Sequence, residues 1–237
     1  MNIFRKDYRI SASIIVLIIL VILTIGAFIA YLSLGESKGR LESLFGSLAA
    51  GMIVAIVQFI IAWQDYKQTE KLKKLKLIEV MYNRALRGQY EDFIRNAARN
   101  LDVMGVTSVR FFSDFADTSL GAPDNATVLL QAMERGVHVR VLLPTDDYIP
   151  DFKKVDSRKV KDKYNELIKK YTNLEIRYFN HTAAHSIFRI DDTCIVGPVF
   201  PDLESRNTPA LHVMTSSPIA LNYLDYFEKE WNNAKGC

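Results

Sequence analysis

The sequence is poor in the residues that hold metal ions and form disulfides. It has two cysteines and four histidines among 237 residues. Cys194 and Cys237 show none of the close spacings typical of a zinc site, so we expect no metal and no cofactor. We expect both cysteines to be free thiols, because the topology argued below places them in a reducing compartment.

Charge is absent from one long stretch near the N-terminus. Ser11–Leu34, SASIIVLIILVILTIGAFIAYLSL, has no charged residue and is long enough to cross a bilayer core of about 30 Å. Leu44–Trp63 is a second such segment. A cleaved signal peptide is excluded because the apolar run is too long, has no small-residue cleavage site and is followed at once by a second span. We therefore predict a hairpin of two transmembrane helices, at about 11–34 and 44–63.

Basic residues flank the predicted hairpin on its open side. The connection GESKGR is too short for a domain, and its basic residues are offset by Glu36 and Glu42. By the positive-inside rule we expect both termini in the cytoplasm, with the lysines after the second span facing an anionic leaflet. The flanking basic residues are Arg5, Lys6 and Arg9 before the first span and Lys67, Lys71, Lys73, Lys74 and Lys76 after the second.

One face of the second span carries small and polar residues. At 3.6 residues per turn, Ser43, Ser47, Gly51, Gln58 and Ala62 fall within a narrow arc. We interpret this face as the surface through which the two helices pack closely. The alternative is that it lines an opening when several hairpins assemble, although a polar residue in a span only suggests function.

The segment from Asp65 to about Leu86 has a helical pattern. It contains no glycine or proline, and apolar residues recur at roughly heptad spacing. We expect it to continue the second membrane helix as a neck that breaks at Gly88. The expected organisation is a transmembrane hairpin at 1–66, a helical neck at 67–88 and a C-terminal domain at 89–237.

The C-terminal region alternates helical and strand patterns and then gives a run of strands. We expect helices at 90–105, 125–136, 157–172 and 218–235. We expect strands at 106–112, 137–144, 174–179, 185–191, 194–200 and 210–215. This order is typical of an α/β domain with a mixed sheet.

The same order of elements resembles the phospholipase D superfamily over about Tyr90–Lys235. NLDVMGV is similar to the family's first strand, and LLQAMERGVHVRVLLP to its helix-strand unit. AHSIFRIDDTCIVGP resembles the family signature H-x-K-x(4)-D followed by Gly-Ser, and YFEKEWNNA its closing aromatic helix. The resemblance implies an α/β chain in which a two-helix transmembrane hairpin precedes a phospholipase D-like mixed-sheet domain.

The resemblance also implies that the family's chemistry is lost. In active members a histidine attacks phosphorus, a second histidine from another copy of the motif protonates the leaving group, and lysine, serine and asparagine hold the phosphate. His185 and Asp192 match the signature, but Ile187 stands at the lysine position and Pro198 at the serine position. Ile187 donates nothing, and proline lacks even a backbone N–H. We therefore expect a ligand reader with no catalytic residue, similar to degenerate phospholipase D-like sensor domains.

We expect the ligand site to occupy the former phosphate pocket. Strand alternation places His185, Ile187, Arg189 and Asp191 on one face, where Arg189 would supply part of the lysine's charge. Thr208 and His212 lie on the segment similar to the family's asparagine-bearing strand, and Ser113 follows the expected strand at 106–112, near the sheet edge where ligands bind. The expected ligand-binding residues are His185, Arg189, Asp191, Thr208, His212 and Ser113. Alternatively, the histidine is structural and Arg189 only pairs with a neighbouring aspartate.

The architecture is similar to that of membrane effectors in bacterial anti-phage nucleotide signalling, in particular the Panoptes-type two-transmembrane effectors. This resemblance implies a multi-pass protein of the inner membrane, a homodimer or higher homo-oligomer, with no nucleic acid as partner. It further implies that a cyclic dinucleotide bound between two domains controls oligomerisation and membrane disruption by the helices.

Two other functions are compatible with the same sequence. One is a membrane-anchored phosphodiesterase of the phospholipase D superfamily, a nuclease or a lipase that works with an unusual phosphate clamp. The other is a membrane scaffold or sensor without catalysis, in which the domain recruits a protein or gives no toxic output.

Overall fold

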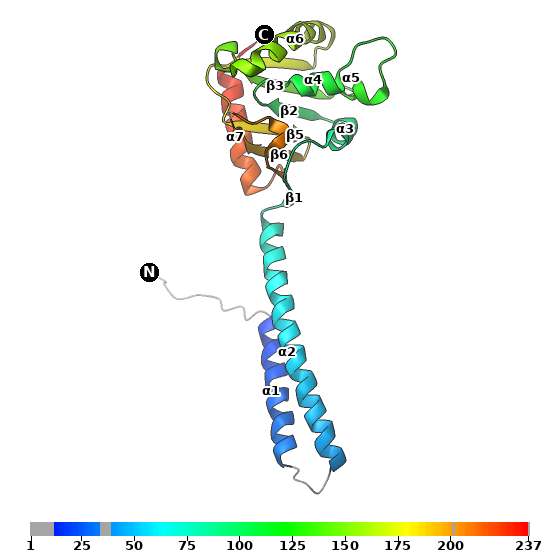
Figure 1. Ribbon diagram of the computed structural model, residues 1–237, viewed down its shortest axis with the longest axis vertical. Coiled ribbons are helices and arrows are strands. Elements are labelled where there is room, and N and C mark those ends of the chain that lie inside the picture. Colours follow the sequence, from blue (N-terminus) through cyan, green and yellow to red (C-terminus); the bar gives the residue numbers. More distant parts are fainter. Residues whose placement is uncertain (1–11, 34–38, 201, 237) are drawn as a thin grey trace, which may run out of the picture. The chain divides into compact units, whose positions relative to one another are not determined.

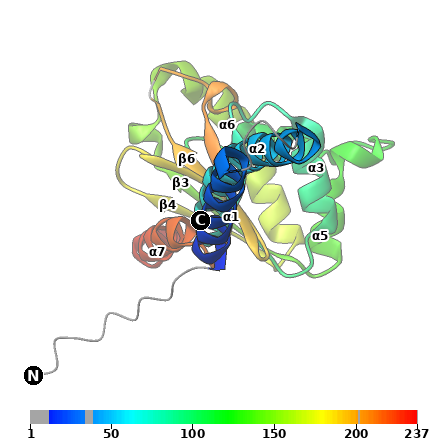
Figure 2. The ribbon, with the colours of Figure 1, turned by 90° about the horizontal axis from the view of Figure 1, so that it is seen from below.

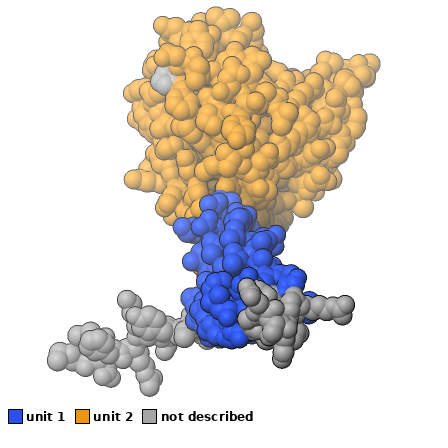
Figure 3. Space-filling view, turned by 60° about the horizontal axis from the view of Figure 1, so that its bottom comes forward, with its two compact units in different colours: residues 1–72 blue, residues 73–237 orange. Residues whose placement is uncertain are grey.

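The computed structural model describes residues 12–33, 39–200 and 202–236. The chain forms two compact units, residues 1–72 and 73–237 (Figure 3). Arg5, Lys6, Arg9 and Lys38, which entered the topology prediction, lie outside the described residues, as does Cys237. Cys194 is a free, buried thiol, which confirms the prediction for that cysteine.

The first unit is built from two long helices, α1 (Ala12–Ser33) and α2 (Gly39–Lys74). Both are long and apolar enough to cross a membrane, at Ile14–Ser33 and within Ser43–Lys74. Most of their isoleucine, leucine and valine side chains are exposed, whereas the core helix of a soluble protein would bury them. The two helices run antiparallel and side by side (Figure 1).

The helices of the hairpin do not pack through the predicted small-residue face. Ala27 and Ala49 are the buried side chains, and a Cβ at Gly46 would lie 3.3 Å from the ring of Tyr31. These contacts bring small residues to the helix interface, an arrangement that is common between membrane helices. The residues expected there are instead exposed within the hairpin: Ser43, Ser47, Gly51, Gln58 and Ala62.

The helical neck expected to reach about Leu86 ends at Lys74. Lys76 adopts a left-handed conformation with φ 50°, and strand β1 (Leu77–Met81) follows. Strand β1 pairs antiparallel with β7 (Ala210–Met214), and Met81 lies opposite Ala210. The prediction was wrong beyond Lys74 because this segment forms backbone hydrogen bonds with β7. That strand lies far along the chain, so the local sequence does not show it.

The second unit contains one eight-stranded mixed sheet in the order β1-β7-β6-β5-β2-β3-β4-β8. Strands β2, β3 and β4 are mutually parallel, and the remaining neighbours pair antiparallel. The remaining strands are β2 (Asn100–Met104), β3 (His138–Pro144), β4 (Leu174–Phe179), β5 (His185–Ile190), β6 (Thr193–Pro198) and β8 (Lys235–Gly236). The α/β fold with a mixed sheet is therefore confirmed.

Helices cover both faces of the sheet, and each face has its own apolar core. Figure 2 shows α7 on one side of the strands and α3 and α5 on the other. The α7 side buries Ile187, Cys194 and Phe227, whereas the opposite side buries Phe112, Phe188 and Ile195. The helices are α3 (Arg87–Asn96), α4 (Val109–Phe115), α5 (Val128–Glu134), α6 (Asp151–Lys170) and α7 (Pro218–Asn233).

Two of the expected boundaries were wrong at the start of this unit. The helix expected at 90–105 ends at Asn96, and its last part is the central strand β2, as the family resemblance indicated. The segment 106–112, expected as a strand, enters helix α4. Phe111, Phe112 and Phe115 are all buried, so one face of a helix places these aromatic residues in the core and overrides their strand propensity.

Candidate functional site

The signature strand β5 points its expected ligand residues toward helix α7. His185, Ile187 and Arg189 do share one face, as alternation predicted, and Ile187 is buried in the α7-side core. The ring of His185 lies edge-on to Tyr223 and Tyr226, at centroid distances of 5.2 and 5.0 Å. Its Nδ1 is buried without a hydrogen-bond partner. The aromatic residues of α7 therefore cover His185.

Arg189 belongs to a buried ion-pair network. Its Nη1 donates to Asp102 Oδ2 at 3.1 Å, and the Asp102 side chain is only 1% exposed. Arg140 pairs with the same carboxylate at 2.7 Å and with Glu228 of α7 at 2.6 Å. Because buried charges are costly unless paired, this network secures α7 to the sheet and occupies the Arg189 side chain.

Asp191 lies just past β5 and acts as a backbone anchor. It has φ 46°, and its carboxylate accepts hydrogen bonds from the backbone N–H groups of Ala98, Arg99 and Asn100. Burial works to raise the pKa of Asp191, but these hydrogen bonds outweigh it and hold the pKa below its ordinary value. Asp191 therefore joins the α3–β2 connection to the β5–β6 turn.

The other three expected residues lie apart from His185. Ser113 is exposed on α4, because the expected preceding strand is a helix. His212 is buried against Phe93 of α3 with its Nε2 unpartnered, and burial lowers its pKa. Thr208 is buried beside Arg84. The six residues predicted as one ligand site thus do not converge, and Thr208 alone among them lines the pocket described next.

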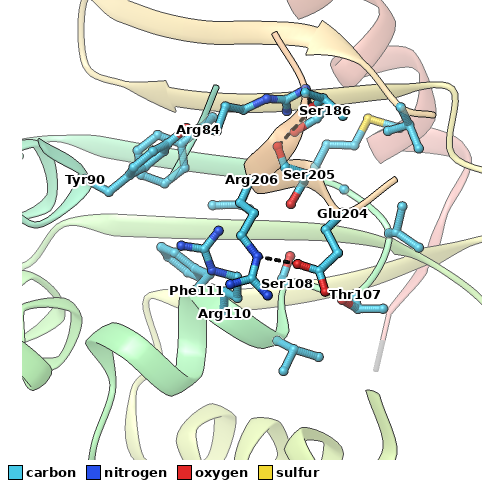
Figure 4. A pocket seen from close by; sticks show the side chains of 18 of the residues that line it. Arg84, Tyr90, Thr107, Ser108, Arg110, Phe111, Ser186, Glu204, Ser205 and Arg206 are labelled. Carbon is cyan, nitrogen blue, oxygen red and sulfur yellow. Dashed lines mark hydrogen bonds and ion pairs between the residues drawn. The ribbon is translucent and has the colours of Figure 1, made fainter. Parts of the chain in front are cut away.

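A pocket of about 290 Å³ opens at the C-terminal end of β2, where side chains of both faces of the sheet line it, Phe188 from one face and Ile187 from the other. Figure 4 shows residues from several segments around it. They include the connection 105–108 with the start of α4, Arg84 with the start of α3, residues 186–188 of β5, the start of α6, and residues 198–200 and 203–208. The pocket lies where β2 meets the antiparallel strand β5, and such a change of strand direction is a common place for ligand sites in α/β sheets.

Arg84 is a buried cation at the wall of this pocket. It is 6% exposed, and its Nη2 donates to Thr208 Oγ1 at 2.7 Å and to the carbonyl oxygen of Pro198 at 3.0 Å. Its Nε is buried without a partner, and no carboxylate of the described residues lies within 4 Å of its guanidinium. Burial accordingly lowers its pKa. Such a group is costly unless an anion pairs with it.

Gly197 allows this arrangement. A Cβ at this position would lie 2.7 Å from the carbonyl oxygen of Pro209 and 3.0 Å from Arg84 Nη2. The glycine of the VGP sequence therefore makes room for the close approach of Arg84 and the chain leading into β7.

Ser108 supplies a second unsatisfied polar group. It lies in the pocket wall before α4 with φ 46°, a conformation that is uncommon for residues other than glycine. Its Oγ is buried without a hydrogen-bond partner. Strained backbone and orphaned polar atoms cluster at binding sites, where a ligand satisfies them.

Positive charge exceeds negative charge in the pocket lining. Five cationic side chains line it, against three carboxylates. The cations are Arg84, Arg87, Arg110, Lys153 and Arg206, and the carboxylates are Asp114, Asp156 and Glu204. Arg206 forms an ion pair with Glu204, and Arg110 lies 3.7 Å from Asp114. The arrangement favours an anionic ligand.

Aromatic side chains form an apolar wall beside these charges. Tyr90 lies 5.0 Å from Phe188, and Phe188 lies 6.0 Å from Phe111, measured between ring centroids. Burial raises the pKa of Tyr90 to about 12, so its hydroxyl stays neutral. Cations next to aromatic faces are the combination that binds a phosphate together with a planar ring.

Sequence reasoning missed Arg84, Ser108, Arg110 and Arg206. Arg84 and Arg206 lie in connections, where no periodicity marks them, and Ser108 and Arg110 fell within the segment 106–112, which was expected to be a strand. The one usable signal was the VGP sequence, whose glycine marks a close backbone approach. Within the described residues, no group of three or more histidine, cysteine, aspartate or glutamate side chains is placed to hold a metal ion.

Comparison with known proteins gives similarity of fold only. No protein-family model and no curated protein matches the sequence. TrmBL2, an archaeal chromatin protein, matches with a TM-score of 0.46 and 12% identity over 85% of this chain and 71% of that chain. Nuc from Salmonella typhimurium, a phospholipase D family member, matches at 0.42 and 16%, over 67% of this chain and 96% of Nuc. NucT from Helicobacter pylori matches at 0.41 and 13%, over 63% and 89%. At these identities and TM-scores, the activity of none of these proteins can be assigned to this chain.

Proposed function

We propose that the C-terminal unit is a non-catalytic domain that binds a nucleotide in the Arg84 pocket and thereby controls the two apolar helices. The observation that carries this proposal is Arg84 itself. It is a buried guanidinium with no carboxylate partner among the described residues, and it lines the same pocket as Ser108, whose hydroxyl has no hydrogen-bond partner. Phosphate oxygens suit groups of both kinds, because arginine matches the geometry of phosphate and a hydroxyl can donate to it.

The rest of the pocket lining favours a nucleotide over a simple anion. Bases stack on aromatic faces with little dependence on their identity, and Tyr90, Phe111 and Phe188 supply such faces. Arg110 and Arg206 add positive charge on the same pocket wall as Glu204 (Figure 4), and Lys153 also lines the pocket. A cyclic dinucleotide combines two phosphates with two bases, which suits a lining of this kind.

The absence of catalysis is part of the proposal. Phosphodiester cleavage by the family's route needs a histidine nucleophile and a second histidine as acid. His185, the histidine at the signature position, is covered by two tyrosines of α7. Ile187 and Pro198 stand where the family has lysine and serine. These features support a reader of the nucleotide rather than a hydrolase.

The output of binding would be a change in the membrane. The two helices are long and apolar enough to span a bilayer, and we place the chain in the bacterial inner membrane with both termini in the cytoplasm. In this proposal the chain is an effector of anti-phage defence whose nucleotide ligand shifts the equilibrium between homo-oligomeric states, one of which disrupts the membrane. The ligand acts only through its different affinity for those states.

The test uses the full chain purified in detergent. Thermal unfolding is measured with cyclic di-AMP, cyclic di-GMP, cyclic GMP–AMP and cyclic tri-AMP, and each nucleotide is then recovered and chromatographed. A ligand at a hundred times its dissociation constant adds about 2.7 kcal/mol to stability. We expect one nucleotide to stabilise the chain and to be recovered intact. Arg110→Ala should weaken this effect, whereas the control Arg158→Ala, which removes an arginine outside the pocket lining, should not.

Three results would contradict the proposal. Cleavage of the nucleotide would establish a phosphodiesterase instead. Absence of stabilisation by every nucleotide would favour a scaffold. For the third result, dye is enclosed in proteoliposomes that carry the chain. If it leaks equally fast with and without the stabilising nucleotide, the nucleotide does not control the effect of the helices on the membrane.

A further inference from the structure

One carboxylate lies among the cations of the pocket. Glu204 forms an ion pair with Arg206, two residues along the chain, and both side chains line the pocket (Figure 4). The hydrogen bond from Arg206 is the main reason why the pKa of Glu204 is below its ordinary value, and the charges of Lys153 and Arg110 lower it further. Three cations of the pocket lining therefore act on this single carboxylate.

The cations around Glu204 have few competing partners. Lys153 Nζ donates to the carbonyl oxygen of Leu203 at 3.4 Å, and burial lowers the pKa of this lysine against the pull of Glu204. Arg110 has Asp114 at 3.7 Å, and the charge of Asp114 acts on Arg206 as well. Among the described residues, Glu204 forms its ion pair with Arg206 and interacts with Lys153 and Arg110 through their charges.

We infer that Glu204 is a built-in competitor, whose carboxylate occupies the place that a phosphate group of the ligand takes on binding. The inference rests on the proposed function and specifies how the same pocket is regulated. A carboxylate carries one negative charge and two oxygens, so it mimics part of a phosphate. The ligand must displace Glu204 from Arg206 before its phosphate can pair there. Glu204 consequently sets the affinity threshold and rejects weakly charged ligands.

The strength of the Glu204–Arg206 pair suits this role. The two side chains are about half exposed, at 51% and 49%, and exposed ion pairs contribute little because water and salt screen them. A phosphate brings more charge and bidentate geometry, so it can replace the carboxylate. Removal of the competitor should therefore tighten phosphate binding by about three- to tenfold rather than by orders of magnitude.

The test is isothermal titration of Glu204→Gln, as full chain in detergent, with inorganic pyrophosphate and cyclic di-AMP as probes. The control is Glu175→Gln, which removes the partner of Arg177 from another glutamate–arginine pair of the same spacing, on β4 and away from the pocket. Both variants change the net charge equally. Because Glu204 is exposed, we expect both to unfold at the parent's temperature. The double variant Glu204→Gln/Arg206→Ala shows whether a gain depends on Arg206.

We expect Glu204→Gln to bind the probes about three- to tenfold more tightly than the parent and Glu175→Gln, and the gain to vanish without Arg206. Equal or weaker binding by Glu204→Gln would overturn this inference and leave the proposed function intact, since it would show that Glu204 orients Arg206 instead of competing with the ligand. A gain in affinity that persists without Arg206, or that also appears in Glu175→Gln, would show that the effect comes from the change in net charge. That result would also overturn the inference. Failure of both probes to bind any of the proteins would overturn the proposed phosphate site together with the inference.

Discussion

Arg84 Nη2 donates a 2.7 Å hydrogen bond to Thr208 Oγ1, joining residues 124 positions apart in the sequence. Both residues are buried, and Thr208 Oγ1 in turn donates to the carbonyl oxygen of Ser205 at 2.8 Å. The bond fixes a cation against the segment that leads into β7. The pocket wall is therefore held together by the positive charge of Arg84, which no carboxylate of the described residues neutralises.

Gly197→Ala should destabilise the chain and weaken nucleotide binding. The new Cβ would meet the Pro209 carbonyl oxygen at 2.7 Å, and this backbone atom can move only with the strand. We expect a loss of about 1–3 kcal/mol, which is typical of overpacking. The control is Gly88→Ala in α3, where a Cβ meets nothing within 4 Å. Thermal unfolding of both variants checks this. Equal midpoints would show that Gly197 is not needed for close approach.

Asp191→Asn should destabilise the chain at neutral pH but not in acid. The carboxylate accepts three backbone N–H groups, and the amide would replace one accepting oxygen with a donor. We expect a loss of about 1–3 kcal/mol at pH 7. The pKa of Asp191 is depressed in the folded state, so its contribution is fully present above the unfolded value of about 3.9 and is lost as the pH falls from there through the lower folded pKa.

The control for this prediction is the neighbouring Asp192→Asn. Its side chain is 72% exposed and forms an ion pair with the exposed Arg99, so the unfolding temperature should stay at the parent value. Unfolding is followed at pH 7 and at about pH 3. A difference between Asp191→Asn and the parent that is equally large at both values would mean that the charge of Asp191 is not what holds the α3–β2 connection.

Arg189→Ala separates the two candidate faces of the sheet. Arg189 pairs with buried Asp102, which keeps Arg140 as a second partner, so we expect a loss of about 1–3 kcal/mol of stability. Binding of the nucleotide should be unchanged at a temperature where the variant is folded. Loss of binding by the folded variant would return the ligand to the α7-side face, where the sequence motif predicted it.

The elements that alternation could reveal were the ones predicted well. Strands β3 to β7 and helix α7 follow their patterns because each has one clear period and turn residues at its ends. The segment 106–112 has strand-type residues, yet Phe111 and Phe112 lie in helix α4. Both side chains are buried in the core there, and this packing outweighs their strand propensity. Strand β1 depends on pairing with β7, which no local pattern can show.

The candidate site was harder to predict than the fold. Alternation correctly grouped His185 with Arg189, but it could not say which face α7 would cover, because both faces of this sheet are apolar. The motif therefore directed attention to a buried network. Arg84 and Ser108 come from connections and gain their importance only from burial and from the absence of a described partner, which are properties of the folded chain.

The most direct test of the central claim is a titration of Arg84→Met with the nucleotide that stabilises the parent chain. Methionine fills similar space without charge, and replacing a buried charge by an apolar side chain often leaves a protein folded. The account predicts a folded variant with at least about tenfold weaker affinity, since a buried charge-assisted hydrogen bond to phosphate is lost. A folded Arg84→Met that binds the nucleotide as tightly as the parent would contradict it.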